Sequence, residues 1–403
     1  MLKIQEYISL FSNIEEANRY LKSNLGIQSR EGSIWTADSM DHLYIYNYHP
    51  RKSPKHNPIV KEANGLILNK NNEVVSFPFR RFYDIDHPNA DVLDDNGARA
   101  KIMENGLLVV IFYYKGYWNV QSEFSVNATE TIDCNGFKSR LRYRVIDVLQ
   151  NKFGIEKPFS PFENYPTEDV CYVFEYVSPY IKKLTSYKKE DLLFISAYNK
   201  RMQLEMNDHW LYNWKKKLPN EDAFDSPDSF FVRDRSQVED ILMCLNSFQK
   251  GLVIVDNLGN RVKMMNPRYK NLHKLLKAGR NPSTKLLSKM ILSGEVLRMG
   301  PYYKSYREVL GVFGIHLQRI HAKINRVWHA NKHLDQEKFA KVIRCYKKST
   351  RNILFNLKKD EKRTIESCIR GMNPKVLARE MELCYLDELT RELDRLEEVE
   401  IED

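Results

Sequence analysis

Residues 102–109 read Ile-Met-Glu-Asn-Gly-Leu-Leu-Val, which is a turn signal followed directly by the start of a β-strand. Asn and Gly tolerate the backbone angles of tight turns, so Asn-Gly before an apolar run is also a plain hairpin signal. Similar short β-type runs recur from about residue 43 to residue 265, with turn residues between them. The predicted strands are Leu43–Tyr46, Gly65–Leu68, Gly106–Tyr114, Cys171–Tyr176, Leu192–Tyr198 and Leu252–Val255.

The period of the apolar residues changes after Pro267, from that of strands to that of helices. One helix, predicted over residues 136–152, interrupts the strands. Beyond residue 267 we expect helices alone, with long apolar-periodic stretches over residues 303–330 and 334–357. A last helix begins with Asn373 as its N-cap and Pro374 at its first position. The pattern predicts an α+β chain, with a mixed domain of residues 1–266 and an α-helical domain of residues 267–403.

The composition favours a protein with a polyanionic partner. The chain has 403 residues, a formal net charge of +10 and a pI near 9.0, and such a balance is most often found in nucleic-acid-binding proteins. Six scattered cysteines without a C-x-x-C pair disfavour a disulfide framework or a zinc ribbon. No stretch has the length of a membrane span, and no signal-peptide pattern opens the chain. We therefore expect a cytoplasmic protein with no membrane contact.

Charge is divided unevenly along the helical part. Residues 257–294 contain nine Lys or Arg and no acidic residue, whereas residues 380–403 are dominated by Glu and Asp. The basic stretch could face RNA phosphates, or it could be the solvated outer face of an amphipathic helix pair. The acidic C-terminal helix could bind a protein partner or pack on its own domain. Its apolar stripe is formed by Leu377, Met381, Leu386, Leu389 and Leu393.

Residues 103–106, Met-Glu-Asn-Gly, resemble the Lys-x-Asp/Asn-Gly motif of the phage tRNA-repair family of ATP-dependent RNA ligases. In that family the neutral amine of the lysine attacks the α-phosphate of ATP. Met103 stands at the position of this nucleophile, and a thioether cannot form the phosphoramidate. Glu104, Asn105 and Gly106 keep the rest of the motif, and the resemblance implies that they contact the nucleotide.

The resemblance continues in order along the chain, from about residue 43 to residue 280. Residues 63–68 and 76–83 resemble the strand before the motif and the Arg/Lys-Phe-Phe/Tyr segment, which carries Arg80 and Arg81. Residues 121–125 occupy the place of the family's sugar-contacting strand. Residues 173–179 resemble the strand whose glutamate, here Glu175, binds the ribose or a metal.

Four further positions depart from the family's pattern. Asn64 and Tyr198 stand where the family has arginines, and Lys250 replaces a metal-associated glutamate. The later Lys-x-Lys strand keeps Lys263, but Met265 replaces its second lysine. Several losses together are typical of natural degeneration of a site rather than of one laboratory substitution.

The resemblance implies a nucleotidyltransferase domain of the RNA/DNA-ligase type with antiparallel sheets, followed by the helical domain. It also implies ATP and Mg²⁺ as cofactors, RNA such as nicked tRNA as the partner, and the cytoplasm of a host cell if the source is a phage or virus. The side chains expected to contact the nucleotide or RNA phosphates are Arg80, Arg81, Lys250, Lys263, Arg268, Lys270, Lys274 and Lys277.

Three functions stay open on the sequence. The first is a pseudo-ligase that binds RNA ends without adenylylation. The second is an ATP-dependent ligase that seals RNA breaks, either through Lys101 as a substitute nucleophile or as a nucleophile-disabled variant. The third is a protein-interaction or assembly subunit. Lys101 and Met103 are two residues apart, so in an extended segment both side chains face the same way.

Overall fold

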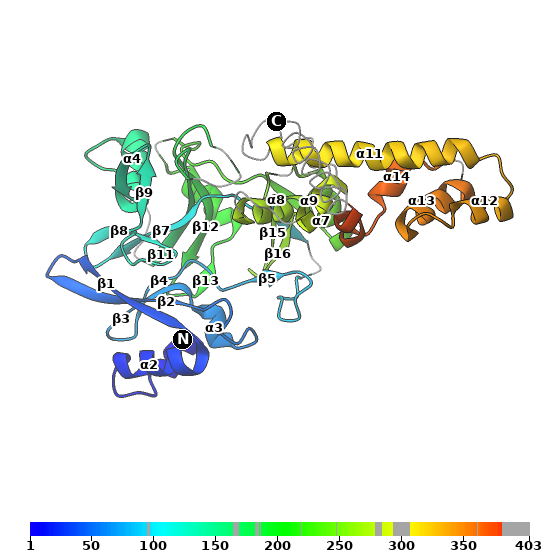
Figure 1. Cartoon of the computed structure of the whole chain (residues 1–403). Coiled ribbons are helices and arrows are strands. Elements are labelled where there is room, and N and C mark those ends of the chain that lie inside the picture. The colour runs from blue at the N-terminus through cyan, green and yellow to red at the C-terminus, as the bar shows by residue number, and fades with distance from the viewer. Residues whose placement is uncertain are drawn as a thin grey trace, which may run out of the picture. The chain divides into compact units, whose positions relative to one another are not determined.

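The structure is a computed structural model that describes residues 1–94, 97–163, 169–181, 185, 187–218, 220–246, 248–278, 284–292, 307–360 and 362–380. The chain forms two compact units, Met1–Asn266 and Pro267–Asp403. The first unit contains sheets and helices, and the described part of the second contains helices alone (Figure 1). The predicted α+β class is confirmed, and every strand pair in the sheets is antiparallel except one.

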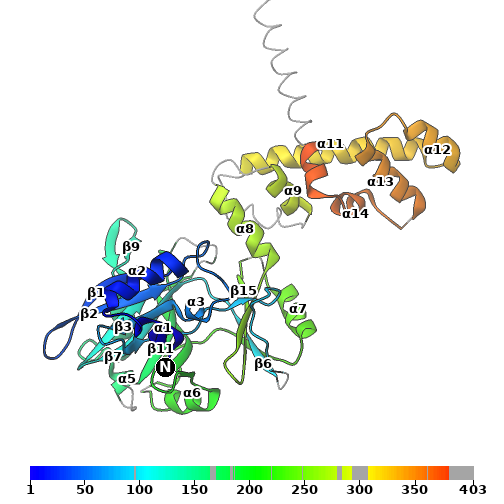
Figure 2. The same cartoon turned by 90° about the horizontal axis from the view of Figure 1, so that it is seen from below.

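The N-terminal sheet has the strand order β1-β2-β3-β4. Two amphipathic helices, α1 and α2, cover one face of it (Figures 1 and 2), where Ile4 and Leu21 pack against Tyr46 and Leu68. Alternation of apolar side chains along the strands provides both buried faces of this sheet. Its elements are α1 (Lys3–Ile8), α2 (Ile14–Leu25), β1 (Gln28–Trp35), β2 (Met40–Asn47), α3 (Pro58–Glu62), β3 (Asn64–Asn69) and β4 (Val74–Ser76).

A central sheet, in the order β13-β12-β11-β7-β8, packs on the other face of the N-terminal sheet. Its outer face buries a cluster of aromatic rings around Phe162 and Trp214, which α4, α5 and α6 help to form. The elements are β7 (Leu107–Tyr114), β8 (Tyr117–Ser122), α4 (Leu141–Phe153), α5 (Ser160–Glu163), β11 (Val170–Val177), β12 (Asp191–Asn199), β13 (Leu204–Glu205) and α6 (Asp208–Lys215).

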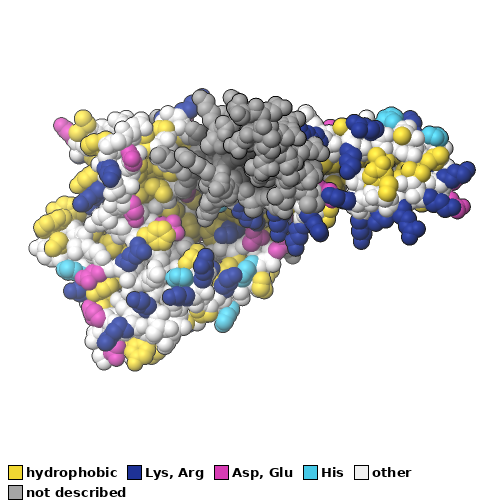
Figure 3. All heavy atoms as spheres, in the orientation of Figure 1, with side chains coloured by type: hydrophobic (Ala, Val, Ile, Leu, Met, Phe, Trp, Pro, Cys, Tyr) yellow, Lys and Arg dark blue, Asp and Glu magenta, His cyan; other side chains and the backbone are white. Residues whose placement is uncertain are grey.

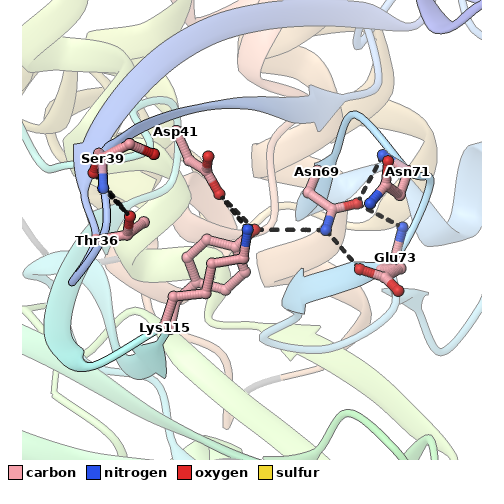
Figure 4. Close-up of polar contacts among 8 residues, drawn as sticks. Thr36, Ser39, Asp41, Asn69, Asn71, Glu73 and Lys115 are labelled. Atoms are coloured by element: carbon pink, nitrogen blue, oxygen red, sulfur yellow. Dashed lines mark hydrogen bonds and ion pairs between the residues drawn. The ribbon is translucent and has the colours of Figure 1, made fainter.

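The turn from β7 to β8 is tied to the N-terminal sheet by a carboxylate. Lys115 Nζ and Tyr114 OH donate hydrogen bonds to Asp41 Oδ2 at 2.8 and 3.0 Å (Figure 4). The bond from Lys115 holds the pKa of Asp41 below its ordinary value, with a smaller contribution from Tyr114. These contacts fix the two sheets relative to each other at one end of the unit.

The third sheet has the order β14-β6-β15-β16-β5, in which β16 and β5 are the parallel pair. One face is apolar and packs on α7, through residues such as Ala100, Ile254 and Val238. The opposite face carries lysines and forms part of the pocket described below. The elements are β5 (Tyr83–Asp84), β6 (Ala98–Ile102), β14 (Ser229–Val232), α7 (Arg235–Cys244), β15 (Gly251–Asp256) and β16 (Arg261–Met265).

All six strands predicted from the sequence are present, but the helix predicted over residues 136–152 begins too early. Residues 137–140 form a strand, β10 (Phe137–Arg140), which pairs with β9 (Thr131–Cys134). Asn135 and Gly136 form the two-residue turn of this hairpin and have positive φ values of 57° and 95°. The turn chemistry therefore decides the local structure, and α4 begins only at Leu141.

The second unit has a core in which Ile324 of the longest helix packs with Phe339 and Leu354. The helical stretch predicted over residues 334–357 is two helices, because the chain turns at residues 344–347 so that both can bury their apolar faces. The last predicted helix is present over residues 374–380, and its continuation lies outside the described residues. The elements are α8 (Pro267–Ala278), α9 (Thr284–Leu292), α11 (Arg307–Asn331), α12 (Gln336–Ile343), α13 (Lys348–Lys359) and α14 (Ile365–Arg370).

None of the helices in the described ranges is both long and apolar enough to cross a membrane.

Candidate functional site

A pocket of ≈ 390 Å³ in the first unit has the lysine-bearing face of the third sheet as its floor. Strand register aligns the floor in rows: Lys101 of β6 lies opposite Val253 of β15, which lies opposite Lys263 of β16. In the next row Met103 N–H donates to Gly251 O at 2.9 Å, and Gly251 pairs with Met265. Period-two alternation explains why these side chains share one face while their neighbours pack on α7.

The pocket is richer in cationic than in anionic side chains. Its cationic residues are Arg81, Lys101, Lys250, Arg261 and Lys263, and its acidic residues are Glu104, Glu123 and Glu175. Five against three leaves a formal excess of two positive charges among the lining side chains. Ligand-binding pockets in proteins generally have volumes between about 300 and 1,000 Å³. This pocket therefore has room for an anionic ligand of nucleotide size.

Arg81 has unused hydrogen-bonding capacity inside the pocket wall. Its Cζ lies 3.7 Å from the ring centroid of Tyr48 and 4.8 Å from that of Tyr83. Its Nη1 atom is buried and has no hydrogen-bond partner in the described part of the chain. A buried N–H donor without an acceptor is costly, so an anionic group at this place would be stabilised.

Arg261 and Lys263 meet the aromatic rings of the 76–83 segment. Arg261 Cζ lies 4.6 Å from the Phe79 centroid, and Lys263 Nζ lies 5.5 Å from the Phe82 centroid. The guanidinium of Arg261 also donates to Glu205 Oε2 at 2.6 Å. The charge of Arg261 is therefore matched within the protein, and the pocket floor is held rigid at this edge.

Residues 103–106 pass between the third and central sheets and are fixed at both ends. Gly106 N–H donates to Glu175 Oε1 at 2.7 Å. A Cβ atom added at Gly106 would stand only 2.3 Å from Tyr176 O and 2.7 Å from Glu175 Cγ. Only glycine lets this segment approach β11 so closely, which explains the glycine of the motif.

Glu104 lies in an unusual environment. Burial raises the pKa of its carboxyl group, and the hydrogen bond that Tyr187 OH donates to Glu104 Oε2 at 2.7 Å acts in the opposite direction. Burial also raises the pKa of Tyr187 itself. The same Tyr187 oxygen accepts from Asn105 N–H at 3.1 Å. Tyr187 therefore positions two successive residues of the motif.

Many of the predicted site residues line this pocket together. They are Arg81, Lys101, Met103, Glu104, Gly106, Glu175, Lys250 and Lys263.

Other predicted site residues lie elsewhere. Arg80 is not among the lining residues, and its Nη2 lies 3.9 Å from Glu62 Oε1. Asn105 is buried, and its side chain donates to Thr185 Oγ1 at 3.2 Å. Its predicted contact with a nucleotide stays a prediction. Arg268, Lys270, Lys274 and Lys277 belong to α8 of the second unit.

Two of the positions that depart from the family's pattern have different environments. Asn64 lines the pocket and donates to Phe79 O at 3.2 Å. Tyr198 is buried in the N-terminal core, where it packs edge-on against Phe77 with the ring centroids 4.9 Å apart. The tyrosine is thus part of the core rather than of the pocket lining.

The carboxylates of the pocket do not assemble into a metal site made by protein side chains. Across the described residues, no group of three or more His, Cys, Asp or Glu side chains is placed to hold a metal ion. Glu175 Oε1 accepts from Gly106 N–H, Glu104 accepts from Tyr187, and Lys250 adds a cation. The lining therefore offers more cationic groups to an anion than carboxylates to a divalent cation.

Some lining residues were not predicted from the sequence. Arg261 could have been found, because it alternates with Lys263 and Met265 on the same strand. Tyr48 and Glu123 reach the pocket from the N-terminal sheet and from the end of β8. No local pattern marks Tyr48, because its position depends on how the sheets pack. Glu123 lies within residues 121–125, which the resemblance assigned to the sugar-contacting strand, although it was not named as a site residue.

The second unit carries a basic surface of its own. Figure 3 shows lysine and arginine side chains gathered over α11 to α13. Exposed examples are Lys323 and Arg326 on α11 and Lys338 and Lys341 on α12, although the last two pair with Asp335 and Glu337.

On α8 Tyr269 is buried and stacks on His273, with the ring centroids 5.9 Å apart. Tyr269 thus packs as a core residue.

Comparison with known proteins gives relatives among the ligases, although no protein-family model matches the chain. A protein of Autographa californica nuclear polyhedrosis virus, described as "Putative bifunctional polynucleotide kinase/RNA ligase", is 23% identical over 283 residues. The match covers 65% of this chain but only 38% of the viral protein.

Similar solved structures are also ligases. An RNA ligase from Naegleria gruberi, solved with ATP and Mn, is 13% identical with a TM-score of 0.33, over 44% of this chain and 51% of that one. An archaeal ATP-dependent RNA ligase is 12% identical with a TM-score of 0.44, over 70% and 68% of the two chains. Each of these likenesses is one of fold, with low similarity. The chain spans about half the length of the Naegleria enzyme.

Proposed function

We propose that the first unit is a nucleotidyltransferase domain of the RNA-ligase type that binds an adenine nucleotide and a phosphorylated RNA end without bonding covalently to the nucleotide. The proposal rests on one observation above all. Met103, which the sequence resemblance aligns with the family's lysine, lines the pocket together with Lys101, Lys250 and Lys263. Nicked tRNA is the RNA that the sequence resemblance suggests.

The residues divide the task of holding an anion between them. Lys101 and Lys263 offer ammonium groups from the floor, and Arg81, whose Nη1 is buried, offers its guanidinium from the wall. Hydrogen bonds to charged groups are worth about 1.5–3 kcal/mol each. Cations that are held by strands need little reorganisation when the ligand arrives. The arrangement therefore supports reversible binding of a polyphosphate.

By the sequence resemblance, Lys250 replaces a metal-associated glutamate of the family. This reversal of charge has a testable consequence. Mg²⁺ neutralises part of the charge of ATP, so a pocket that supplies fixed cations has more to gain from metal-free ATP. We expect ATP to bind at least as tightly in EDTA as in magnesium, measured by isothermal titration calorimetry. A Lys250→Glu variant, which restores the family's charge, is the matched control and should reverse the preference. ATP binding that is lost in EDTA would contradict the proposal.

An active ligase is the second candidate, because Lys101 lines the same pocket one row from Met103. Its neutral Nζ would attack the α-phosphorus, forming a P–N bond and releasing one proton to solvent, while the bond to the bridging oxygen breaks and pyrophosphate leaves. Two residues along a strand displace the nucleophile by about 6–7 Å. Productive attack tolerates misplacement of only about 1 Å, so reversible binding is favoured.

The assembly-subunit function has no comparable support, because most of the acidic C-terminal stripe lies outside the described residues.

A further inference from the structure

A second groove of ≈ 580 Å³ lies in the first unit, between β1 and the segment that joins β8 to β9. Its most prominent side chain is Phe124, which is 43% exposed. An aromatic ring of this kind is a platform on which a nucleobase can stack. The remaining lining residues include Arg30, Ser125, Asn127, Thr129 and Glu130.

The backbone that carries Phe124 is held in place before any ligand arrives. Ser122 Oγ accepts hydrogen bonds from Phe124 N–H at 3.3 Å and from Ser125 N–H at 3.0 Å, and it donates to Glu130 Oε1. Farther along, Ser125 Oγ and Thr129 Oγ1 are 2.9 Å apart and hydrogen-bonded. Side-chain hydrogen bonds thus fix the segment, and a fixed platform loses little entropy on binding.

Three charged side chains line the groove, Arg30, Glu31 and Glu130. Glu31 is bonded to His42, whose Nδ1 lies 2.6 Å from Glu31 Oε1. Arg30 Cζ lies over one face of the Phe124 ring, 5.7 Å from its centroid, so a cation stands at the aromatic surface. Glu130 Oε2 is buried and accepts no hydrogen bond in the described part of the chain. An aromatic face, a cation and a spare acceptor together suit a base, its phosphate and an amino or hydroxyl donor of the same nucleotide.

The pocket and the groove are each lined by one of two consecutive residues. Glu123 lines the pocket and Phe124 lines the groove, and consecutive Cα atoms are about 3.8 Å apart. Asn47 Nδ2 donates to Glu123 O at 3.0 Å and fixes this junction to β2. A strand that ends in the pocket therefore has a short route to the Phe124 ring.

We propose that the groove is a subsite for a single-stranded RNA nucleotide, whose base stacks on Phe124 and whose phosphate meets Arg30, while the phosphorylated end of the same strand occupies the pocket. The subsite rests on the function proposed above, because it assumes an RNA end in the pocket. It adds a site that binds a nucleotide farther along the strand than the phosphorylated end. Stacking makes it tolerant of sequence, since every base has a π-face.

The test compares two exposed phenylalanines in fluorescence-anisotropy titrations with a 5′-phosphorylated RNA oligonucleotide. Phe124→Ala is expected to weaken RNA binding about 5- to 100-fold, while the affinity for ATP stays at its native value. Phe137→Ala removes a ring that is 69% exposed on β10 and lines neither the pocket nor the groove. This control should bind RNA as the native protein does.

A second readout does not depend on affinity. RNA oligonucleotides that carry 5-iodouracil at successive positions are irradiated with the native protein, and cross-linked peptides are identified by mass spectrometry. We expect one position to cross-link to the peptide containing Phe124.

The outcomes separate the subsite from the pocket. Native-like RNA binding by Phe124→Ala, or cross-links that avoid residues 123–131, would overturn the subsite while ATP binding leaves the pocket intact. Competition by unrelated peptides but not by RNA would also overturn it and assign the groove to a peptide. A native protein that binds neither ATP nor RNA would contradict the proposed function itself, and the subsite with it.

Discussion

A Lys263→Met variant is expected to bind ATP about 10- to 100-fold more weakly than the native protein, because it removes a charge-assisted hydrogen bond worth about 1.5–3 kcal/mol. Lys263 lies on the pocket floor, opposite Val253 and in the same row as Lys101. Methionine keeps a flexible apolar stem of similar length. The sheet should therefore keep its packing while the pocket loses a cation. Calorimetric titration with ATP measures the change.

Lys115→Met is the matched control for this change. Lys115 is 51% exposed and bonds Asp41 at the turn between β7 and β8, and it does not line the pocket. Its replacement should leave ATP affinity unaltered. If both variants weaken ATP binding equally, the ligand responds only to overall charge, and the pocket is not its site. Native affinity in Lys263→Met would exclude Lys263 from the binding surface.

The replacement Gly106→Ala is expected to lower the free energy of unfolding by about 2–4 kcal/mol, which is in the upper range for a single substitution. The added methyl group would stand 2.3 Å from Tyr176 O, a distance at which the backbone must move. Movement would also lengthen the 2.7 Å bond from Gly106 N–H to Glu175. Urea unfolding monitored by circular dichroism and tryptophan fluorescence gives the change.

Gly314→Ala makes the same chemical change at an open position. Gly314 lies within α11. Apart from its chain neighbours and the backbone of its own helix, no atom of the described residues lies within 4 Å of the Cβ that alanine would add. Alanine is favoured over glycine in a helix by about 0.8–1.0 kcal/mol, so this variant should not be destabilised. Equal destabilisation of both variants would contradict the close approach of Gly106 to β11.

The sheets could be predicted from the sequence because their signals are local. Apolar runs bounded by turn residues marked six strands, and each of them is present. The helix over residues 136–152 was placed too early, because Asn135-Gly136 is the turn of the β9–β10 hairpin and α4 begins only after β10. The break between α12 and α13 was missed, because it serves packing on α11 and has no proline or glycine to mark it.

The candidate site was predicted in part. Motif order identified Met103, Glu175 and Lys263, and strand alternation explains why they meet in one pocket. Tyr187 could not be predicted to hold the motif, since its bonds to Glu104 and Asn105 join residues more than 80 positions apart. The Phe124 groove likewise depends on packing between β1 and a distant loop. Contacts of this kind depend on the tertiary structure, and no periodic pattern of residues in the sequence indicates them.

Adenylylation of the protein is the most direct measurement of the central claim, which is that the pocket binds a nucleotide without bonding to it. The native protein is incubated with α-labelled ATP and magnesium, and intact-mass spectrometry and denaturing gels then detect any AMP that remains attached. The account predicts that native protein retains no AMP after denaturation, although it binds ATP before denaturation. AMP attached to the native protein, and lost in a Lys101→Arg variant, would contradict the account and identify Lys101 as the nucleophile.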